Sequence, residues 1–256
     1  MAKIESYTEK TTLADTDVFV LADSEALDAE SDLTTKKVVR RNIGPTLNPR
    51  TTFFIKDDFG PGAGTALNIG ELPWSSVGGT ITNLAAEVDR PGLLRRDTSA
   101  TSGVNAYISL RNASATILLP VELFDMTFIL RLNTNDAATL VRFGIVDNAG
   151  TNPPTHGIFI EKLAADTQWF GVTRAASVQT RTAALATVDT AWHRFRIRRV
   201  NGTTIGFTLD AGTELTLTAT IPTAALNVYL AIINSAAAAK TIDIDYFELT
   251  ITGLTR

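Results

Sequence analysis

A regular alternation of apolar and charged residues between Asp189 and Ile221 limits, more than any other feature, what this chain can fold into. Its apolar positions include Phe195 and Ile197, and the charged positions around them are Arg194, Arg196 and Arg198. A period of two places the apolar side chains on one face of a β-strand and the guanidinium groups on the other. The segment therefore predicts a strand with one buried and one solvated face.

Turn signals divide the same segment into three strands. Asn201-Gly202 is the dipeptide that most readily supplies the two positive-φ positions of a type I′ hairpin turn. A second turn is expected at 210–212, ahead of a third strand that starts at Leu215. We therefore predict a β-meander with one buried face.

Short strands of the same kind continue from Phe53 to the end of the chain. In DMTFILRL, four apolar residues share one side: Met126, Phe128, Leu130 and Leu132. Clusters of Gly, Asn, Asp and Pro separate the strands, and no long segment keeps a helical period. This pattern predicts an all-β fold, an antiparallel two-sheet jelly-roll sandwich over residues 53–256, with a short N-terminal arm before it.

The last strand changes phase along its length. Apolar residues keep one parity up to Tyr246 and the other parity from Phe247 onward. A β-bulge produces such a shift, although a strand buried on both faces would also tolerate it.

The composition excludes several classes of site. The 256 residues include no cysteine, which excludes disulfides, thiolate catalysis and thiolate metal ligands. No run of about 18 apolar residues is present that would predict a membrane-spanning helix, and the polar start MAKIESYTEKTT lacks the apolar core of a secretory signal. A net charge of −4 argues against general nucleic-acid binding, which depends on neutralising phosphates. We expect neither a nucleic-acid partner nor membrane insertion.

The first 50 residues differ in charge from the rest. Residues 1–32 carry nine acidic and two basic side chains, a net charge of −7, and residues 33–50 carry five basic side chains and no acid. Only VFVLA at 18–22 offers a short apolar strand, so the segment has too little apolar surface for a core of its own. We expect residues 1–52 to be an assembly arm and linker that becomes ordered against a partner; a solvated leader is the alternative. The residues expected to anchor it are Asp15, Asp17, Val18, Val20, Leu21, Lys36, Lys37, Arg40 and Arg41.

Two parts of the chain resemble known families. The order HGIFIEK, DTQWFGVTR, TVDTAWHRFRIRRVNGTTIGFTLD and IDIDYFEL resembles a concanavalin-A-like (laminin-G-like) lectin or glucanase sandwich over about residues 53–256. The arm, with TTLADTDVFVLAD before TTKKVVRRNI, resembles the N-terminal segments of phage tail-fibre and head-fibre proteins.

The resemblance implies a non-enzymatic structural protein on the surface of a phage virion, either a head or tail fibre or a capsid decoration protein. It implies a homotrimer that is attached to other virion proteins through residues 1–50. The lectin-like body would be displayed for adhesion to host-surface polysaccharide. A free carbohydrate-binding module and a glycoside hydrolase of the same fold are the alternatives.

The hydrolase alternative depends on one carboxylate cluster. Glucanases of the concanavalin-like fold carry an E-x-D-x-x-E pattern, and this chain has Asp243, Asp245 and Glu248 at the same spacing. An aspartate replaces the first glutamate and is one methylene shorter. Retaining glycosidases need carboxyl groups about 5–5.5 Å apart, so we expect no enzymatic activity and a solvent face with acidic residues.

Other candidate sites are few. Trp169 and Trp74, together with Arg174, are the candidates for glycan contacts, and a buried Trp169 is the alternative. The histidines His156 and His193, without cysteine, do not make an ordinary structural zinc site. A Ser-His-Asp arrangement stays open on spacing alone, although the chain has no G-x-S-x-G nucleophile elbow. The candidate calcium ligands are Asp57-Asp58 and Asp147-Asn148, but neither pair forms an EF-hand loop, and we expect no cofactor.

The arginine row at 194–198 has several interpretations. It lacks the interleaved exposed aromatic residues of a nucleic-acid site. As a glycan site it would suit carboxylated or sulfated sugars, because guanidinium groups pair well with oxyanions. We interpret it as the solvated face of a sheet, with intersubunit ion pairs as the next alternative.

Overall fold

The computed structural model describes residues 18–21, 36–39, 51–60, 69–111, 116, 122–148 and 153–254. The chain divides into two compact units, Met1–Asn48 and Pro49–Arg256. In the first unit, β1 (Val18–Leu21) pairs antiparallel with β2 (Lys36–Val39). The strand expected at VFVLA is present. The sequence predicted no strand at its partner, β2, because the segment begins with two lysines. The two valines that follow the lysines are β-branched and favour a strand.

The described strands of the second unit form two antiparallel sheets. The eight-stranded sheet has the spatial order β15 (Leu215–Leu217), β14 (Thr204–Leu209), β13 (His193–Asn201), β8 (Leu123–Leu132), β17 (Thr241–Thr252), β6 (Leu93–Asp97) and β5 (Thr80–Leu84), and β3 (Thr52–Asp57) also pairs with β17. The seven-stranded sheet has the order β12 (Val178–Thr187), β11 (Gln168–Ala175), β10 (Gly157–Lys162), β9 (Thr139–Val146), β16 (Asn227–Asn234), β7 (Asn105–Leu110) and β4 (Trp74–Val77).

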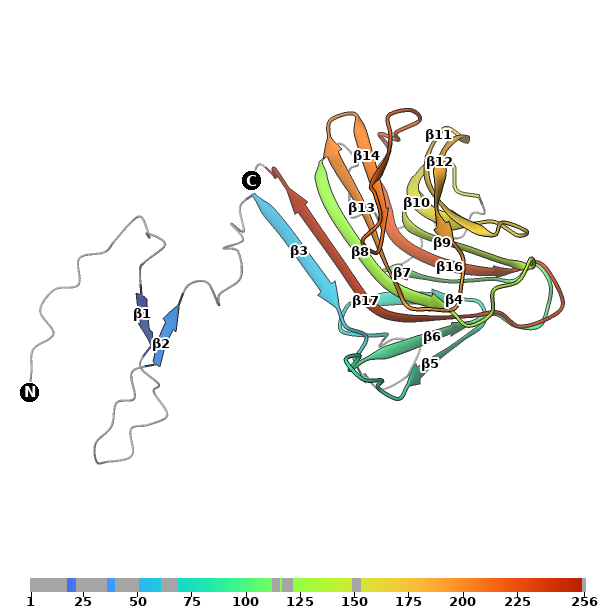
Figure 1. Ribbon diagram of the computed structural model, residues 1–256, viewed down its shortest axis with the longest axis horizontal. Coiled ribbons are helices and arrows are strands. Elements are labelled where there is room, and N and C mark those ends of the chain that lie inside the picture. The colour runs from blue at the N-terminus through green and yellow to red at the C-terminus, as the bar shows by residue number, and fades with distance from the viewer. Residues whose placement is uncertain are drawn as a thin grey trace, which may run out of the picture. The chain divides into compact units, whose positions relative to one another are not determined.

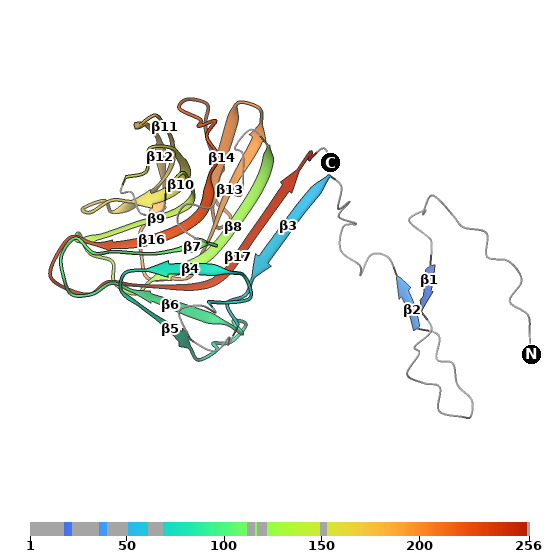
Figure 2. The ribbon, with the colours of Figure 1, turned by 180° about the vertical axis from the view of Figure 1, so that it is seen from behind.

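The two sheets lie face to face as a sandwich, and strands far apart in sequence are neighbours within each layer (Figures 1 and 2). The described part of the chain contains no helix, so it also contains none that is long and apolar enough to cross a membrane. The predicted all-β, two-sheet antiparallel fold is confirmed.

A chain of aromatic rings joins the inner faces of the two sheets. The ring of Phe128 on β8 lies 5.4 Å from that of Phe143 on β9, and Phe143 lies 4.9 Å from Phe195 on β13. Trp169 packs edge-on against both Phe143 and Phe195. The four apolar residues predicted to share one side of β8 are all fully buried in this core. Aromatic pairs at such distances add about 0.5–1.5 kcal/mol each beyond the area that they bury.

The predicted meander is present, but its first turn differs from the prediction. Strands β13, β14 and β15 pair in sequence, yet neither Asn201 nor Gly202 has a positive φ, so the turn is not type I′. A bulge between Arg199 and Asn201 shifts the register by one residue. The Asn201 side chain then accepts a hydrogen bond from the Thr203 amide (2.9 Å), and the Arg199 guanidinium donates to carbonyls of the turn. Side-chain hydrogen bonds of this kind close a turn without positive φ angles.

The bulge predicted in the last strand is confirmed. The register of β17 against β8 shifts between Ile244 and Tyr246. The side chains of Ile244 and Phe247 consequently both enter the core, although their positions differ by an odd number, which in a regular strand would place them on opposite faces. The same shift places Asp243 and Glu248 together on the outer face of the sheet.

Candidate functional site

The outer face of the eight-stranded sheet carries rows of charged and hydroxyl side chains. The strand registers align Glu248 of β17, Thr127 of β8 and Arg196 of β13 in one row. A groove of about 530 Å³ lies over this face, and we call it the arginine groove. It is lined by Asp125, Thr127, Arg194, Arg196, Arg198 and Glu248, with six further residues of β8, β13 and β17.

Two of the three outward arginines are held by acids of the same sheet. The Nε of Arg196 donates to both carboxylate oxygens of Asp125 (2.8 and 3.1 Å). Arg198 donates to Glu214 through Nε (2.6 Å) and Nη2 (3.0 Å). No ion pair joins Arg194 to any residue that the structure describes, and its side chain is exposed. The face is solvated, as predicted, and Arg196 and Arg198 have ion-pair partners in the same chain.

Tyr246 and Glu248 lie side by side on the same face. The phenol of Tyr246 donates a short hydrogen bond to Glu248 Oε2. Burial, and then this contact with a carboxylate, raise the pKa of Tyr246 well above its ordinary value of 10. The phenol therefore remains a hydrogen-bond donor at neutral pH and is not poised to act as a nucleophile.

The two aspartates of the glucanase-like cluster are occupied by arginines. Asp243 is fully buried, and it accepts hydrogen bonds from Arg95 (2.7 and 2.9 Å) and Arg131 (3.0 Å). Burial acts to raise the pKa of Asp243, but hydrogen bonds from Arg95, Asn133 and Arg131 outweigh it and hold the pKa below its ordinary value. Asp245 accepts from Arg90, and burial raises its pKa. Glu248 is thus the member of the cluster that faces the groove.

Trp192 was not predicted to belong to a site. Its ring lies between the guanidinium groups of Arg90 (4.4 Å) and Arg131 (4.5 Å), and its Nε1 donates to Glu87 (3.1 Å). This indole is half-buried, whereas the other two tryptophans are buried. The sequence signal for a partly exposed tryptophan was its position, because Trp192 precedes β13 and so lies before the alternation of buried apolar residues begins.

The residues predicted to contact glycan do not form one site. Trp169 and Trp74 are 1% and 3% exposed, and the Nε1 of Trp74 donates to Asp57 (2.8 Å). Arg174 lies on the outer face of the other sheet, where it donates to Gln179 (3.0 Å). Because both indoles are inside the sandwich, the expectation that they form stacking platforms at the surface is corrected.

The outer face of the seven-stranded sheet contains a buried polar network. Arg142 donates to Glu161 (3.0 Å) and lies over the ring of Phe159 (5.0 Å). Glu161 also accepts from Gln179 (2.9 Å) and lies 3.3 Å from Arg181. Each carboxylate oxygen of Glu161 has a charged or amide partner, which indicates a structural cross-link between strands.

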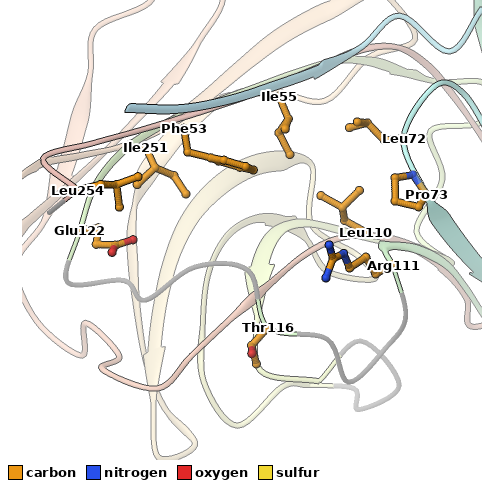
Figure 3. Close-up of a pocket in the computed structure, with 10 residues that line it drawn as sticks. All are labelled: Phe53, Ile55, Leu72, Pro73, Leu110, Arg111, Thr116, Glu122, Ile251 and Leu254. Atoms are coloured by element: carbon orange, nitrogen blue, oxygen red, sulfur yellow. The ribbon is translucent and has the colours of Figure 1, made fainter. Parts of the chain in front are cut away.

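A second cavity, also about 530 Å³, lies at one end of the sandwich (Figure 3). Apolar side chains make up most of its lining, among them Phe53 of β3, Leu110 of β7 and Ile251 of β17. Its two charged residues, Arg111 and Glu122, lie apart in Figure 3. Among the described lining residues, these two ionisable groups are therefore not in contact with each other.

Comparison with known proteins assigns the sandwich to a family. Residues 89–245, more than half of the chain, match the family described as SO2946-like, C-terminal domain. The chain belongs to this family. A search of curated protein sequences gave no match.

Solved structures that are similar to this chain include lectin and glucanase folds. The protein of unknown function SO2946 from Shewanella oneidensis MR-1 is 17% identical, with a TM-score of 0.59 over 80% of this chain and 89% of that one. The carbohydrate recognition domain of Emp47p is 9% identical (TM-score 0.54, 81% and 100% covered). The endo-1,3-beta-glucanase of Streptomyces sioyaensis is 13% identical (TM-score 0.54, 83% and 100% covered). At these identities the similarity establishes the fold alone, a lectin- or glucanase-like β-sandwich, which confirms that part of the resemblance.

Two of the candidate calcium ligands, Asp57 and Asp58, have partners within the chain. The Asp57 carboxylate accepts from the amides of Phe59 and Leu72 and from the indole of Trp74, all at 2.8 Å. Asp58 pairs with Lys56 at 3.4 Å. Among the described residues, no three His, Cys, Asp or Glu side chains are grouped to hold a metal ion. The three N–H groups that Asp57 accepts indicate a structural role for this carboxylate.

The anchoring residues expected in the arm stay untested. Asp15, Asp17, Arg40 and Arg41 lie outside the described residues. Only the backbone pairing of β1 and β2 is described for Val18, Val20, Leu21, Lys36 and Lys37. The assembly role of these residues remains a prediction.

His193, at the start of β13, joins the loop before β13 to the loop after β14. Its Nε2 lies 2.8 Å from Asp189 Oδ1, and its Nδ1 lies 2.6 Å from Asp210 Oδ2. Both ring nitrogens are occupied, so neither is available to activate a serine. Burial acts to lower the pKa of His193, but the hydrogen bonds that its ring donates to Asp210 and Asp189 outweigh this effect and raise the pKa above its ordinary value of 6.5.

We expect His193→Gln to destabilise the domain in a pH-dependent manner. A histidine whose pKa is raised on folding contributes its full stability below its unfolded pKa and loses it as pH rises through the folded pKa. The free energy of unfolding of the wild type should exceed that of the variant by about 1 kcal/mol near pH 6 and by much less near pH 9. The difference is no larger than this because the two aspartates are partly exposed. Urea unfolding at both pH values measures this difference. His156→Gln is the control, since His156 accepts only one backbone N–H, and an equal His193→Gln effect at both pH values would contradict the prediction.

Proposed function

We propose that this chain is a non-enzymatic structural protein of a phage particle, a head or tail fibre or a capsid decoration protein on the virion surface. Residues 1–50 attach it to other virion proteins, in a homotrimer, and the sandwich is displayed outward for contact with host-surface polysaccharide. The resemblance of the arm to phage fibre segments supports the attachment, and the lectin-like fold supports the contact with carbohydrate.

The state of the β17 carboxylates carries the non-enzymatic part of the proposal. A retaining glycosidase needs one carboxylate free to attack and another able to donate a proton. In this chain Asp243 is held by Arg95 and Arg131, and Asp245 is held by Arg90. Of these three, Glu248 alone faces the groove, and the other carboxylate in the groove lining, Asp125, is paired with Arg196. A free carbohydrate-binding module is the second candidate, and the arginine groove favours it.

Deletion of residues 1–50 tests the proposal. We expect the truncated chain to keep the β signal of the sandwich in circular dichroism, because residues 49–256 form a separate compact unit. Its incorporation into particles of the phage that encodes it should fall at least about tenfold, which corresponds to about 1.4 kcal/mol. Immunoblotting of purified particles measures the number of copies.

The matched control is the full-length chain with Arg194→Ala, which should be incorporated at the wild-type level. Incorporation of the truncated chain at that same level would refute the anchoring role of the arm. A full-length chain that is absent from particles would favour the free carbohydrate-binding module.

A further inference from the structure

The arginine groove has a surplus of positive charge in a chain that is acidic as a whole. Four arginines line it (Arg194, Arg196, Arg198 and Arg199), against the two acids Asp125 and Glu248. The whole chain has a net charge of −4. A concave, positively charged site on an acidic protein attracts anions to one place.

Arg194 is the member of this set that is available to a ligand. Arg196 is bonded to Asp125, Arg198 to Glu214, and Arg199 to carbonyls of the following turn. Arg194 is exposed at the groove wall, and it has no ion pair with the described residues. Its backbone amide donates to Asp210 (2.7 Å), which fixes the position of the main chain under the free guanidinium.

The remaining lining suits a polyhydroxylated ligand. Thr127, Thr250 and Thr252 contribute hydroxyl groups, and the carboxylates of Asp125 and Glu248 are acceptors for further hydroxyl groups. Outward side chains along β13 repeat every two residues, about 6.7 Å apart. The groove therefore offers alternating cationic and hydroxyl-binding positions along an extended path.

We propose that the arginine groove binds an acidic polysaccharide, with the guanidinium of Arg194 paired to a carboxylate or sulfate group of the sugar chain. This inference rests on the proposed contact with host-surface polysaccharide and assigns it a place and a ligand class. The planar guanidinium of Arg194 offers two parallel N–H donors to such an oxyanion. Asp125 and Glu248 would accept from neighbouring sugar hydroxyl groups.

A polysaccharide fits this surface better than a nucleic acid does. Binding of single-stranded nucleic acid relies on exposed aromatic rings that stack with bases, and the groove lining includes no exposed aromatic side chain.

Affinity electrophoresis of the full-length protein tests the proposal. The probes are polygalacturonate, dextran sulfate, neutral dextran and poly(dT). We expect retardation by one or both acidic polysaccharides and none by neutral dextran. Arg194→Ala should weaken that binding about tenfold or more, as the loss of a charge-assisted hydrogen-bonding pair does. Carboxylate and sulfate are distinguished by which of the two polymers retards the wild type.

Arg174→Ala is the matched control, because it removes the same charge from the outer face of the other sheet. It should leave the binding unchanged. Equal losses in both variants, no retardation by either acidic polymer, or stronger retardation by poly(dT) would each overturn the proposal. Unfolding of Arg194→Ala should match the wild type, because the side chain has no ion pair to lose.

The proposed virion role is measured separately by incorporation into particles. If the wild type is incorporated but binds no acidic polymer, the groove proposal alone fails. If the protein binds the polymer and is absent from particles, the virion role fails and the groove proposal stands.

Discussion

Asp57→Ala is expected to lower the free energy of unfolding by about 3–6 kcal/mol, because it leaves two buried N–H donors and one part-buried N–H donor without a partner, at about 1–3 kcal/mol for each buried donor. The carboxylate of Asp57 is fully buried at the end of β3. It bonds the amides of Phe59 and Leu72 and the indole of Trp74. Trp74 in turn packs edge-on against Phe247 at 5.2 Å, so the loss extends into the core. Urea denaturation followed by tryptophan fluorescence measures the change.

Asp58→Ala is the matched control for this prediction. Asp58 is the next residue, is 41% exposed, and pairs only with the exposed Lys56. Removal of such a pair changes stability by no more than about 1 kcal/mol. If the two alanine variants unfold at the same urea concentration, Asp57 is not the cross-link that its hydrogen bonds indicate.

Period-two patterns predicted the sheet structure because burial of one face imposes them directly. The alternation at Phe195 and Ile197 identified the inward face of β13, and the phase change after Tyr246 identified the bulge. Both depend on residues that are adjacent in sequence. The type of the first meander turn was missed because the Arg199 side chain and an unforeseen bulge determine it.

The roles of polar and aromatic residues depend on contacts between distant segments, which a single sequence does not display. Trp169 and Trp192 are the same residue type in similar polar surroundings, yet one is in the core and the other lies between Arg90 and Arg131. Asp57 reaches a partner 17 positions away. Gly171 faces Phe207 so closely that a Cβ would lie 2.3 Å from its ring. For the same reason the sequence did not distinguish Arg194 from its neighbours. The structure does, because Arg196 and Arg198 form ion pairs with Asp125 and Glu214, whereas Arg194 has no ion pair with a described residue.

Asp243→Ala is the second substitution with a large expected effect. It leaves the guanidinium groups of Arg95 and Arg131 without their shared carboxylate, and Asp243 itself is fully buried. Breaking a buried pair costs about 3–5 kcal/mol. The side chains of Arg95 and Arg131 are 34% and 22% exposed, so hydration of the unpaired guanidinium groups offsets part of this cost. We therefore expect Asp243→Ala to lower the free energy of unfolding by about 2–4 kcal/mol at pH 7.

The pH dependence separates this charge effect from a simple loss of packing. The folded pKa of Asp243 is depressed, so its contribution is present above the unfolded value near 3.8 and is lost as pH falls through the folded pKa. The difference between wild type and Asp243→Asn in urea unfolding should therefore shrink as pH falls from 5 towards 2. A constant difference over that range would show that the arginine pairs contribute nothing.

Glu248→Gln is the matched control, and it extends the test to the question of catalysis. Glu248 is half-buried and bonds only Tyr246 among the described contacts, so the variant should stay within about 1 kcal/mol of the wild type. In a glucanase, the three positions would be needed together for turnover. In this chain we expect substitution of Asp243 to lower stability and to have no effect on hydrolysis of a β-glucan. We expect Glu248→Gln to change neither stability nor hydrolysis. Turnover of a β-glucan that disappears in Glu248→Gln would contradict this assignment, because it would require the carboxylates to act on substrate while two of them are bonded to arginines.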